Sequence, residues 1–172
     1  MTTSHAGYLD RNLAQRCRDA ILIVREYDHK DARDLVGALY KDQVARYGYA
    51  DPTAADAAMY RAPTGLFLVA YVDGAPAACG GFRQHDSERH MIEIKKMYTV
   101  PAFRGQGLGR RVLAELERRA WEQGARVAIL ETGVRNTTAL GLYISDGFEP
   151  AERYVSGRDP AVNRAFTKKL SY

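Results

Sequence analysis

Three glycines lie within five residues, at positions 105, 107 and 109, between an apolar segment and a long amphipathic segment. Glycine adopts the backbone angles of tight turns without steric penalty, and consecutive amides in such turns can converge on an anion. A helix that begins at the turn adds the positive end of its dipole. The cluster therefore predicts a sharp strand-to-helix connection that suits a phosphate group, although a structural turn without a ligand has the same pattern.

Strand-like and helix-like segments alternate around this turn. Compact apolar runs predict strands at residues 20–25, 66–72, 75–84, 91–100 and 127–131, and two more at about 148–155 and 163–170. Asp73-Gly74 predicts a hairpin turn between two of them. Helical periodicity predicts helices that start at Asp31, Asp51, Leu108 and Asn136 and end near Val44, Tyr60, Gly124 and Gly147. This order favours a single α/β domain with a mixed sheet and helices on its faces.

Length and composition limit the remaining choices. The 172 residues fit one domain, with residues 1–19 as an N-terminal extension that allows a short helix and residues 20–172 as the domain. The longest apolar runs are too short to cross a bilayer, and the N-terminus lacks the pattern of a signal peptide. Two cysteines give no disulfide framework, so we expect a cytoplasmic protein. The net charge of +4 is scattered, which argues against nucleic acid, and no metal-ligand spacing occurs among the histidines.

Two well-known phosphate loops do not fit the glycine cluster. A P-loop requires Lys followed by Ser or Thr after its last glycine, whereas Arg110 and Arg111 follow Gly109 here. A dinucleotide fingerprint has the spacing G-x-G-x-x-G, whereas this chain has G-x-G-x-G. Binding of ATP or NAD through this loop is therefore disfavoured.

The segment Arg104-Gly105-Gln106-Gly107-Leu108-Gly109 resembles the pyrophosphate loop of the GNAT superfamily of N-acetyltransferases. The resemblance extends upstream to the strand that starts at Glu93 and downstream to the Asn136–Phe148 segment, which is similar to the family's second coenzyme-binding motif. It implies the acyl-CoA N-acyltransferase fold, with a mostly antiparallel sheet of about six to seven strands. It also implies acetyl-CoA as acyl donor, an amine as acceptor, no metal, and a monomer or homodimer.

The same resemblance implies where the coenzyme lies. The turn at residues 104–110 would hold the pyrophosphate, and Met97, Tyr98 and Thr99 would pair with the pantetheine arm like an added strand. An amide near Met97 would polarise the thioester carbonyl, and Asn136 would reach the coenzyme from the opposite wall. The coenzyme-binding residues expected from it are Met97, Tyr98, Thr99, Arg104, Gly105, Gln106, Gly107, Leu108, Gly109, Arg110, Asn136 and Tyr143.

Acyl transfer to an amine sets two chemical requirements. An alkylamine with a pKa near ~10.4 is almost entirely protonated at pH 7, so a base or a water chain must remove a proton before it attacks. Glu93 occupies the strand position where some relatives carry their base, although a structural carboxylate paired with Lys95 is the alternative. Tyr143 occupies the family's general-acid position, from which a phenol can protonate the departing thiolate.

The sequence leaves the acceptor open. A primary amine of a small molecule is the first hypothesis, and a protein or peptide amine is the second. A non-catalytic acyl-CoA sensor on the same fold is the third, and the presence of Tyr143 argues for an enzyme.

Overall fold

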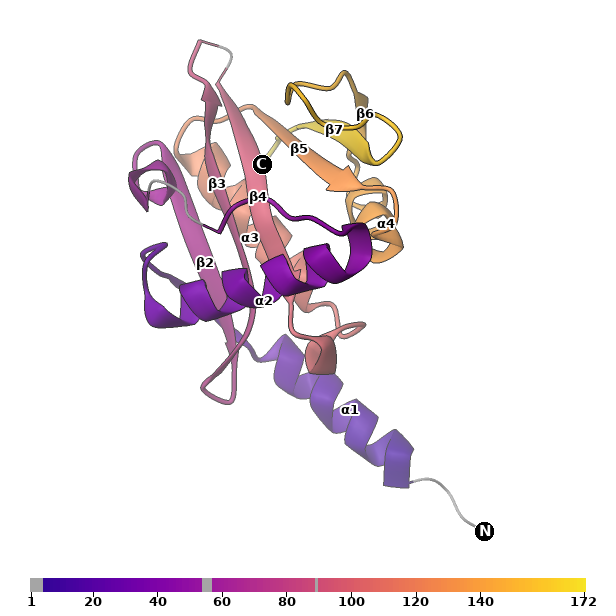
Figure 1. Cartoon of the computed structure of the whole chain (residues 1–172). Helices are drawn as coiled ribbons and strands as arrows, with labels where there is room; N and C mark the ends of the chain where they lie inside the picture. The colour runs from indigo at the N-terminus through magenta and orange to yellow at the C-terminus, as the bar shows by residue number, and fades with distance from the viewer. Residues whose placement is uncertain (1–4, 54–56, 89) are drawn as a thin grey trace.

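The computed structural model describes residues 5–53, 57–88 and 90–172. Within these residues, seven strands form one sheet in the order β1-β2-β3-β4-β5-β7-β6 (Figure 1). All neighbours are antiparallel except β4 and β5, which run parallel. The strands are β1 (Ile21–Val24), β2 (Gly65–Val72), β3 (Ala75–Asp86), β4 (Met91–Thr99), β5 (Val127–Gly133), β6 (Glu149–Ala151) and β7 (Asn163–Lys169). The predicted class, a mixed and mostly antiparallel sheet in a single α/β domain, is confirmed.

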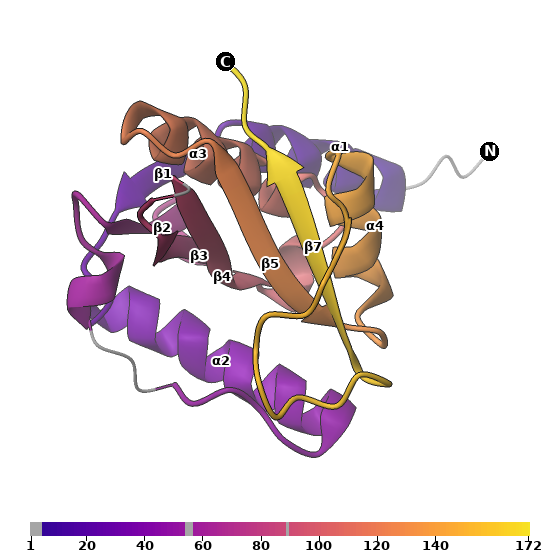
Figure 2. The ribbon, with the colours of Figure 1, turned by 90° about the horizontal axis from the view of Figure 1, so that it is seen from above.

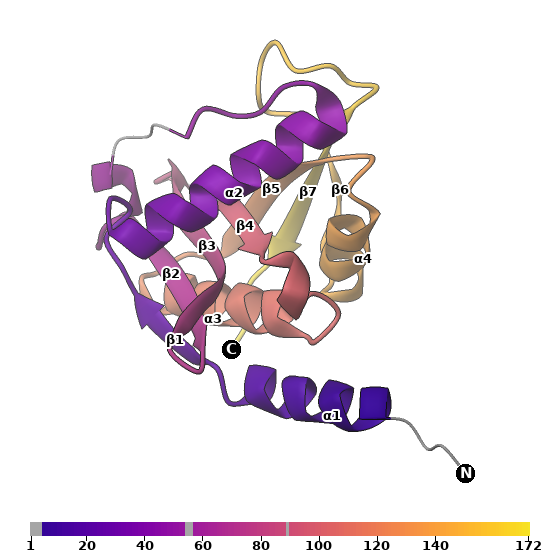
Figure 3. The ribbon, with the colours of Figure 1, turned by 60° about the horizontal axis from the view of Figure 1, so that its bottom comes forward.

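Helices cover both faces of this sheet. Seen from above, α2 lies on one face, while α3 and α4 lie on the other (Figure 2). Helix α1 extends away from the domain beside the α3 face (Figure 3). The helices are α1 (His5–Arg18), α2 (Lys30–Tyr47), α3 (Leu108–Glu122) and α4 (Thr137–Ser145), with short 3₁₀ helices η1 (Ala57–Tyr60) and η2 (Pro101–Phe103).

Strand β2 shows why the sheet requires helices on both faces. All eight of its residues are buried, and successive side chains of a strand point to opposite faces. One set packs toward α3 and the other toward α2, as two separate apolar clusters: Leu66, Leu68, Ala70 and Val72 in the first, and Phe67, Val69 and Tyr71 in the second. A strand without a polar face is stable only between two layers.

The end of α1 is attached to the domain through Arg111. This α3 side chain donates hydrogen bonds to the backbone oxygens of Cys17, at 2.6 Å, and Ala20, at 2.9 Å. Cys17 is completely buried, and Leu13 packs against the same core. A helix is therefore present in the N-terminal segment, as its periodicity allows, while the boundary between extension and domain stays a prediction.

Strand β4 carries the irregularity that matters most for the site. Its pairing with β3 shifts between Cys79↔Tyr98 and Gly81↔Lys95, which places one extra residue in β4. Lys96 lies at this bulge with φ of 59°, an unusual angle for a residue with a side chain. On its other side, β4 pairs with β5 only from Met91 to Glu93. Beyond Glu93, the two parallel strands separate.

Two sequence predictions about the elements are wrong. Asp51-Pro52 does not begin a helix: residues 51–53 are irregular, residues 54–56 lie outside the described part, and only η1 is helical. The Asp51 side chain binds Arg158 and caps no helix. The predicted strand at residues 148–155 is reduced to the three residues of β6. The Asp73-Gly74 hairpin is confirmed, with both residues at positive φ.

The contrast between two glycines tests the packing. A Cβ on Gly65 would collide with the backbone oxygen of Met59 and lie 2.8 Å from that of Phe82, whereas a Cβ on Gly37 in α2 meets nothing within 4 Å. We expect Gly65→Ala to lower the free energy of unfolding by about 1–3 kcal/mol. Gly37→Ala should raise it by about 1 kcal/mol, because alanine is the better helix former. Urea unfolding checks both, and equal stability of the two variants would contradict this description.

Candidate active site

The glycine loop positions the start of α3 beside the end of β4. Gly105 and Gly107 have φ angles of 76° and 80°, which favour glycine over any residue with a side chain. Gly107 is the N-cap residue of α3, and no side chain caps this end of the 15-residue helix. The first amides of the helix are thus left with the partial positive charge of its dipole. This arrangement suits an anion such as a pyrophosphate.

A cleft of about 340 Å³ begins at this loop and runs between β4 and α4. It brings together segments that are more than 30 residues apart in the chain. Of the predicted coenzyme-binding residues, all but Gln106 line it: Met97, Tyr98, Thr99, Arg104, Gly105, Gly107, Leu108, Gly109, Arg110, Asn136 and Tyr143. The structure thus places in one cleft the residues that the sequence assigns to one ligand.

Arg104 holds the loop in place. Its Nε donates to the backbone oxygen of Thr99 at 2.9 Å, and its Nη2 lies 3.4 Å from Oδ1 of Asp42 in α2. Its guanidinium also lies over the Tyr98 ring, 5.5 Å from the centroid. These contacts fix the end of β4, the loop and α2 relative to one another.

Tyr143 lies deep in the cleft on α4. Its ring contacts Phe148 edge to face, with centroids 5.8 Å apart, and the residue is 6% exposed. Burial raises the pKa of the phenol above its ordinary value, because the surroundings disfavour the phenolate. The hydroxyl is therefore protonated at neutral pH.

A second pocket, of about 110 Å³, adjoins the cleft. It lies under the end of α2 and is lined by β4, β5 and the segment that follows β6. Both hollows share a small set of lining residues at their junction: Leu39, Asp42, Arg46, Met97, Asn136 and Tyr143. The candidate acid therefore lies where a ligand in one hollow meets a ligand in the other. Asn136 also lies at this junction. Its Oδ1 caps α4 by accepting a hydrogen bond from the Ala139 amide at 3.3 Å.

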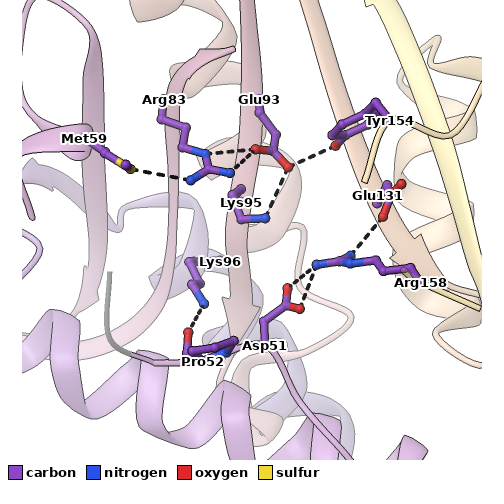
Figure 4. A network of polar contacts seen from close by, with 10 residues as sticks. All are labelled: Asp51, Pro52, Met59, Arg83, Glu93, Lys95, Lys96, Glu131, Tyr154 and Arg158. Carbon is purple, nitrogen blue, oxygen red and sulfur yellow. Dashed lines mark hydrogen bonds and ion pairs between the residues drawn. The ribbon is translucent and has the colours of Figure 1, made fainter. Parts of the chain in front are cut away.

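Glu93 lines this second pocket, and both of its carboxylate oxygens accept hydrogen bonds from neighbouring side chains (Figure 4). Its carboxylate accepts hydrogen bonds from Arg83 at 2.9 Å, Lys95 at 3.1 Å and the Tyr154 hydroxyl at 3.1 Å. Burial alone would raise the pKa of Glu93, but Lys95 and Arg83 outweigh it and hold the pKa below its usual value. A carboxylate with occupied oxygens and a lowered pKa is a weak proton acceptor. The role of Glu93 as base stays a prediction, and its contacts favour a structural role.

A second polar group in the pocket joins three distant segments. Arg158 donates to Oε2 of Glu131 at 3.0 Å and to both carboxylate oxygens of Asp51, at 2.7 and 2.8 Å (Figure 4). Sequence analysis missed these residues because they are remote in the chain. One available signal was that Glu131 is an acid at the end of an otherwise apolar strand segment.

Tyrosines of the α2 region have mixed roles. Tyr47 and Tyr49 line the second pocket, whereas Tyr60 is 2% exposed in the core and Tyr40 is 41% exposed on the surface. A Cβ added to Gly133 would collide with the Tyr47 hydroxyl, so α2 and β5 meet closely there.

The described residues contain neither a cluster of metal ligands nor a membrane-spanning helix. No group of three or more His, Cys, Asp or Glu side chains is arranged to hold a metal ion. No helix in that part of the chain has both the length and the apolar character required to cross a membrane.

A splayed pair of parallel strands, with a glycine loop and helix N-terminus at one end, defines the acyl-CoA N-acyltransferase class. Residues 36–148, more than half of the chain, match the model of the Acetyltransferase (GNAT) family. The chain belongs to this family.

Individual relatives agree with this placement. An IAA acetyltransferase of Azospirillum brasilense is 39% identical over 82 residues, which are 48% of this chain and 53% of that protein. The L-amino acid N-acyltransferase MnaT of Escherichia coli is 32% identical over 94 residues, 55% of this chain and 51% of its own. The match thus spans about half the length of each.

A solved structure shows the same fold along most of its length. The PaiA N-acetyltransferase of Thermoplasma acidophilum, in complex with coenzyme A, superposes with a TM-score of 0.68 at 16% identity. That superposition covers 87% of this chain and 99% of that protein.

Replacing Glu93 separates its two candidate roles. We expect Glu93→Gln to lower the free energy of unfolding at pH 7 by about 2 kcal/mol, less than a fully buried pair would lose, because Arg83 is partly exposed. The difference should be present above the unfolded pKa of about 4.3 and disappear as pH falls through the lower folded pKa. Unfolding at several pH values checks this.

The turnover of the same variant tests the catalytic alternative. A general base contributes about 10²-fold or more, so a change in kcat below about 10-fold is expected for a structural carboxylate. A larger loss at unchanged stability would restore Glu93 as the base.

Proposed function

We propose that this chain transfers the acetyl group of acetyl-CoA directly to a primary amine of a small molecule. The observation that carries the proposal is the junction of the two hollows at Met97, Asn136 and Tyr143. One hollow ends at a helix N-terminus that suits a pyrophosphate, and the other is small and polar. A donor and an acceptor bound in them would meet at the residues that chemistry requires, without a covalent enzyme intermediate.

Each part of the donor has a proposed partner. Backbone amides of Gly105, Gly107, Leu108 and Gly109, with Arg110, would bind the pyrophosphate. The backbone of Met97–Thr99, which β5 does not pair, would bind the pantetheine arm like an added strand. The amide near Met97 would stabilise the negative charge that develops on the thioester oxygen.

The reaction then forms one bond and breaks another. The neutral amine attacks the carbonyl carbon, the C–N bond forms and the C–S bond breaks. Tyr143 gives its proton to the departing thiolate, and the proton lost from the nitrogen returns to it. We assign removal of the ammonium proton before attack to water in the polar pocket, since Glu93 is occupied by three donors.

A small-molecule acceptor is favoured by the size of the second pocket, about 110 Å³. The names of two relatives, an IAA acetyltransferase and an L-amino acid N-acyltransferase, support the same class. A protein amine is the second candidate, and a non-catalytic sensor the third. The cytoplasmic location stays a prediction, with which the unpaired thiols of Cys17 and Cys79 agree.

Ligand-dependent stability tests donor binding. Acetyl-CoA at a hundredfold excess over its dissociation constant should raise the free energy of unfolding by about 2.7 kcal/mol. ATP and NAD at the same concentration should have little effect, because the loop matches neither of their motifs. A thermal shift assay measures all three, and a larger shift with NAD or none with acetyl-CoA would refute the assignment.

Two substitutions separate chemistry from donor binding. Tyr143→Phe removes the hydroxyl but keeps the ring on Phe148, so kcat should fall by about 10²–10⁴-fold at unchanged coenzyme affinity. Gly107→Val should first weaken acetyl-CoA binding, because a branched side chain resists a φ of 80°. Calorimetry and steady-state rates on both variants give the answer. Normal turnover of Tyr143→Phe would exclude it as the acid, and normal binding by Gly107→Val would exclude the loop.

A further inference from the structure

The polar pocket contains a carboxylate oxygen that the protein does not use. The Glu131 side chain is 2% exposed, and Arg158 contacts only its Oε2. Within the described part of the chain, Oε1 is buried and has no hydrogen-bond partner. Buried polar atoms in folded proteins are nearly always paired, so an orphaned carboxylate oxygen in a pocket wall is a place where a bound water or a ligand can supply the donor.

The charge around Glu131 specifies what that donor carries. Arg158 is shared between Glu131 and Asp51, so this group of three has one negative charge in excess. A cation that reached Glu131 would neutralise the excess and give the free oxygen a charge-assisted hydrogen bond. A primary ammonium group meets both requirements.

Lys96 is a cation in the same pocket that lacks a direct carboxylate partner among the described residues. Its Nζ donates to the backbone oxygen of Pro52 at 2.8 Å, and no ion pair joins it to a carboxylate in the described residues. Burial lowers the pKa of Lys96; among the nearby charges, Asp51 opposes this, while the cations Lys95, Arg158 and Arg83 add to it. The other three cations are paired with carboxylates, so an anion in the pocket would give Lys96 the direct partner that it lacks in the described part of the chain.

The bulge in β4 gives Lys96 this location. Its left-handed φ of 59° interrupts the alternation of the strand, and Lys95, Lys96 and Met97 all line the same pocket. Lys95 is already paired with Glu93 at 3.1 Å, so its charge is compensated. Lys96 is thus the cation of this strand that has no carboxylate of its own in the described structure.

We propose that Glu131 and Lys96 are the two poles of the acceptor site, and that the acceptor is a small zwitterion with a primary ammonium and a carboxylate. Glu131 binds the ammonium group through Oε1, and Lys96 binds the carboxylate. Amino acids carry both groups. The corresponding amines without the acid group could bind Glu131 but would leave Lys96 without a partner. The inference rests on the proposed acetyl transfer and makes it more specific.

The test compares matched acceptors with the full-length protein. L-leucine, L-methionine and L-phenylalanine are each assayed against the corresponding decarboxylated amine, by release of the coenzyme thiol from acetyl-CoA. We expect kcat/KM to be at least 10-fold higher for the amino acid in at least one pair. Lys96→Met should reduce that preference by about 10-fold. Lys95→Met is the matched control and should leave the preference unchanged, because Lys95 has a carboxylate partner.

Glu131→Gln tests the other pole. It should raise KM for both members of a pair by about 10- to 100-fold and leave KM for acetyl-CoA unchanged. Asp51→Asn is its control: it also removes one negative charge from the group and one partner of Arg158, but it leaves the free oxygen of Glu131 in place, so it should raise the acceptor KM less than Glu131→Gln does. Equal effects of these two variants would show that Glu131 acts only through Arg158 or through the net charge of the group, and would overturn the ammonium assignment.

Other outcomes distinguish this inference from the proposed function. If amines without an acid group are acetylated as well as or better than the amino acids, the zwitterion assignment is wrong and acetyl transfer to amines stands. If acetyl-CoA binds but neither set is acetylated, the acceptor assignment is also wrong. If acetyl-CoA does not bind, the proposed function itself fails.

Discussion

The separation of β4 from β5 after Glu93 is the constraint on which the site depends. Backbone amides and carbonyls inside a protein need partners, and those of β4 beyond Glu93, where the bulge at Lys96 lies, have none among the described residues of β5. A ligand that presents its own amides can replace the missing strand. At the point of separation lies Glu93, which binds Arg83 of β3, Lys95 of β4 and Tyr154 of the segment after β6. One buried carboxylate thus holds together the elements around the opening.

Asp42 connects the two hollows across α2. It pairs with Arg46 in its own helix at 3.0 Å and with Arg104 of the glycine loop at 3.4 Å. Arg104 also donates a hydrogen bond to the Thr99 carbonyl at the end of β4. The glycine loop is therefore connected both to β4 and to the wall of the polar pocket. The first residue of the loop motif therefore acts here as a support for the backbone turn. The amides that follow it are left for an anion.

The sheet class that the sequence predicted is confirmed, and the predicted coenzyme-binding residues lie together although their role stays a prediction; both expectations depend on local patterns. The glycine turn, the strand before it and the helix after Asn136 are each short and continuous, and their residues line one cleft. Sequence analysis failed where a long-range contact decides the outcome. Asp51-Pro52 has the pattern of a helix start, but Asp51 is bound to Arg158, 107 residues away. The residues that line the polar pocket are also far apart in the chain, so the sequence did not reveal the pocket. For Glu93 the sequence suggested only Lys95 as a partner, whereas Arg83 and Tyr154 also bind its buried carboxylate.

The cleft and the polar pocket thus differ in how much of each lies within the family pattern, and this difference affects which acceptors the pocket could select. The family pattern covers residues 36–148 and includes the loop, Tyr143 and the strands that separate. Arg158 lies beyond it, on the segment that follows β6, yet it contacts Glu131 and Asp51 in the polar pocket. Substitutions in that segment can therefore alter the charge of the polar pocket without moving the amides of the glycine loop. The glycine loop is thus one continuous segment of the chain, whereas the polar pocket is built from side chains that only folding brings together.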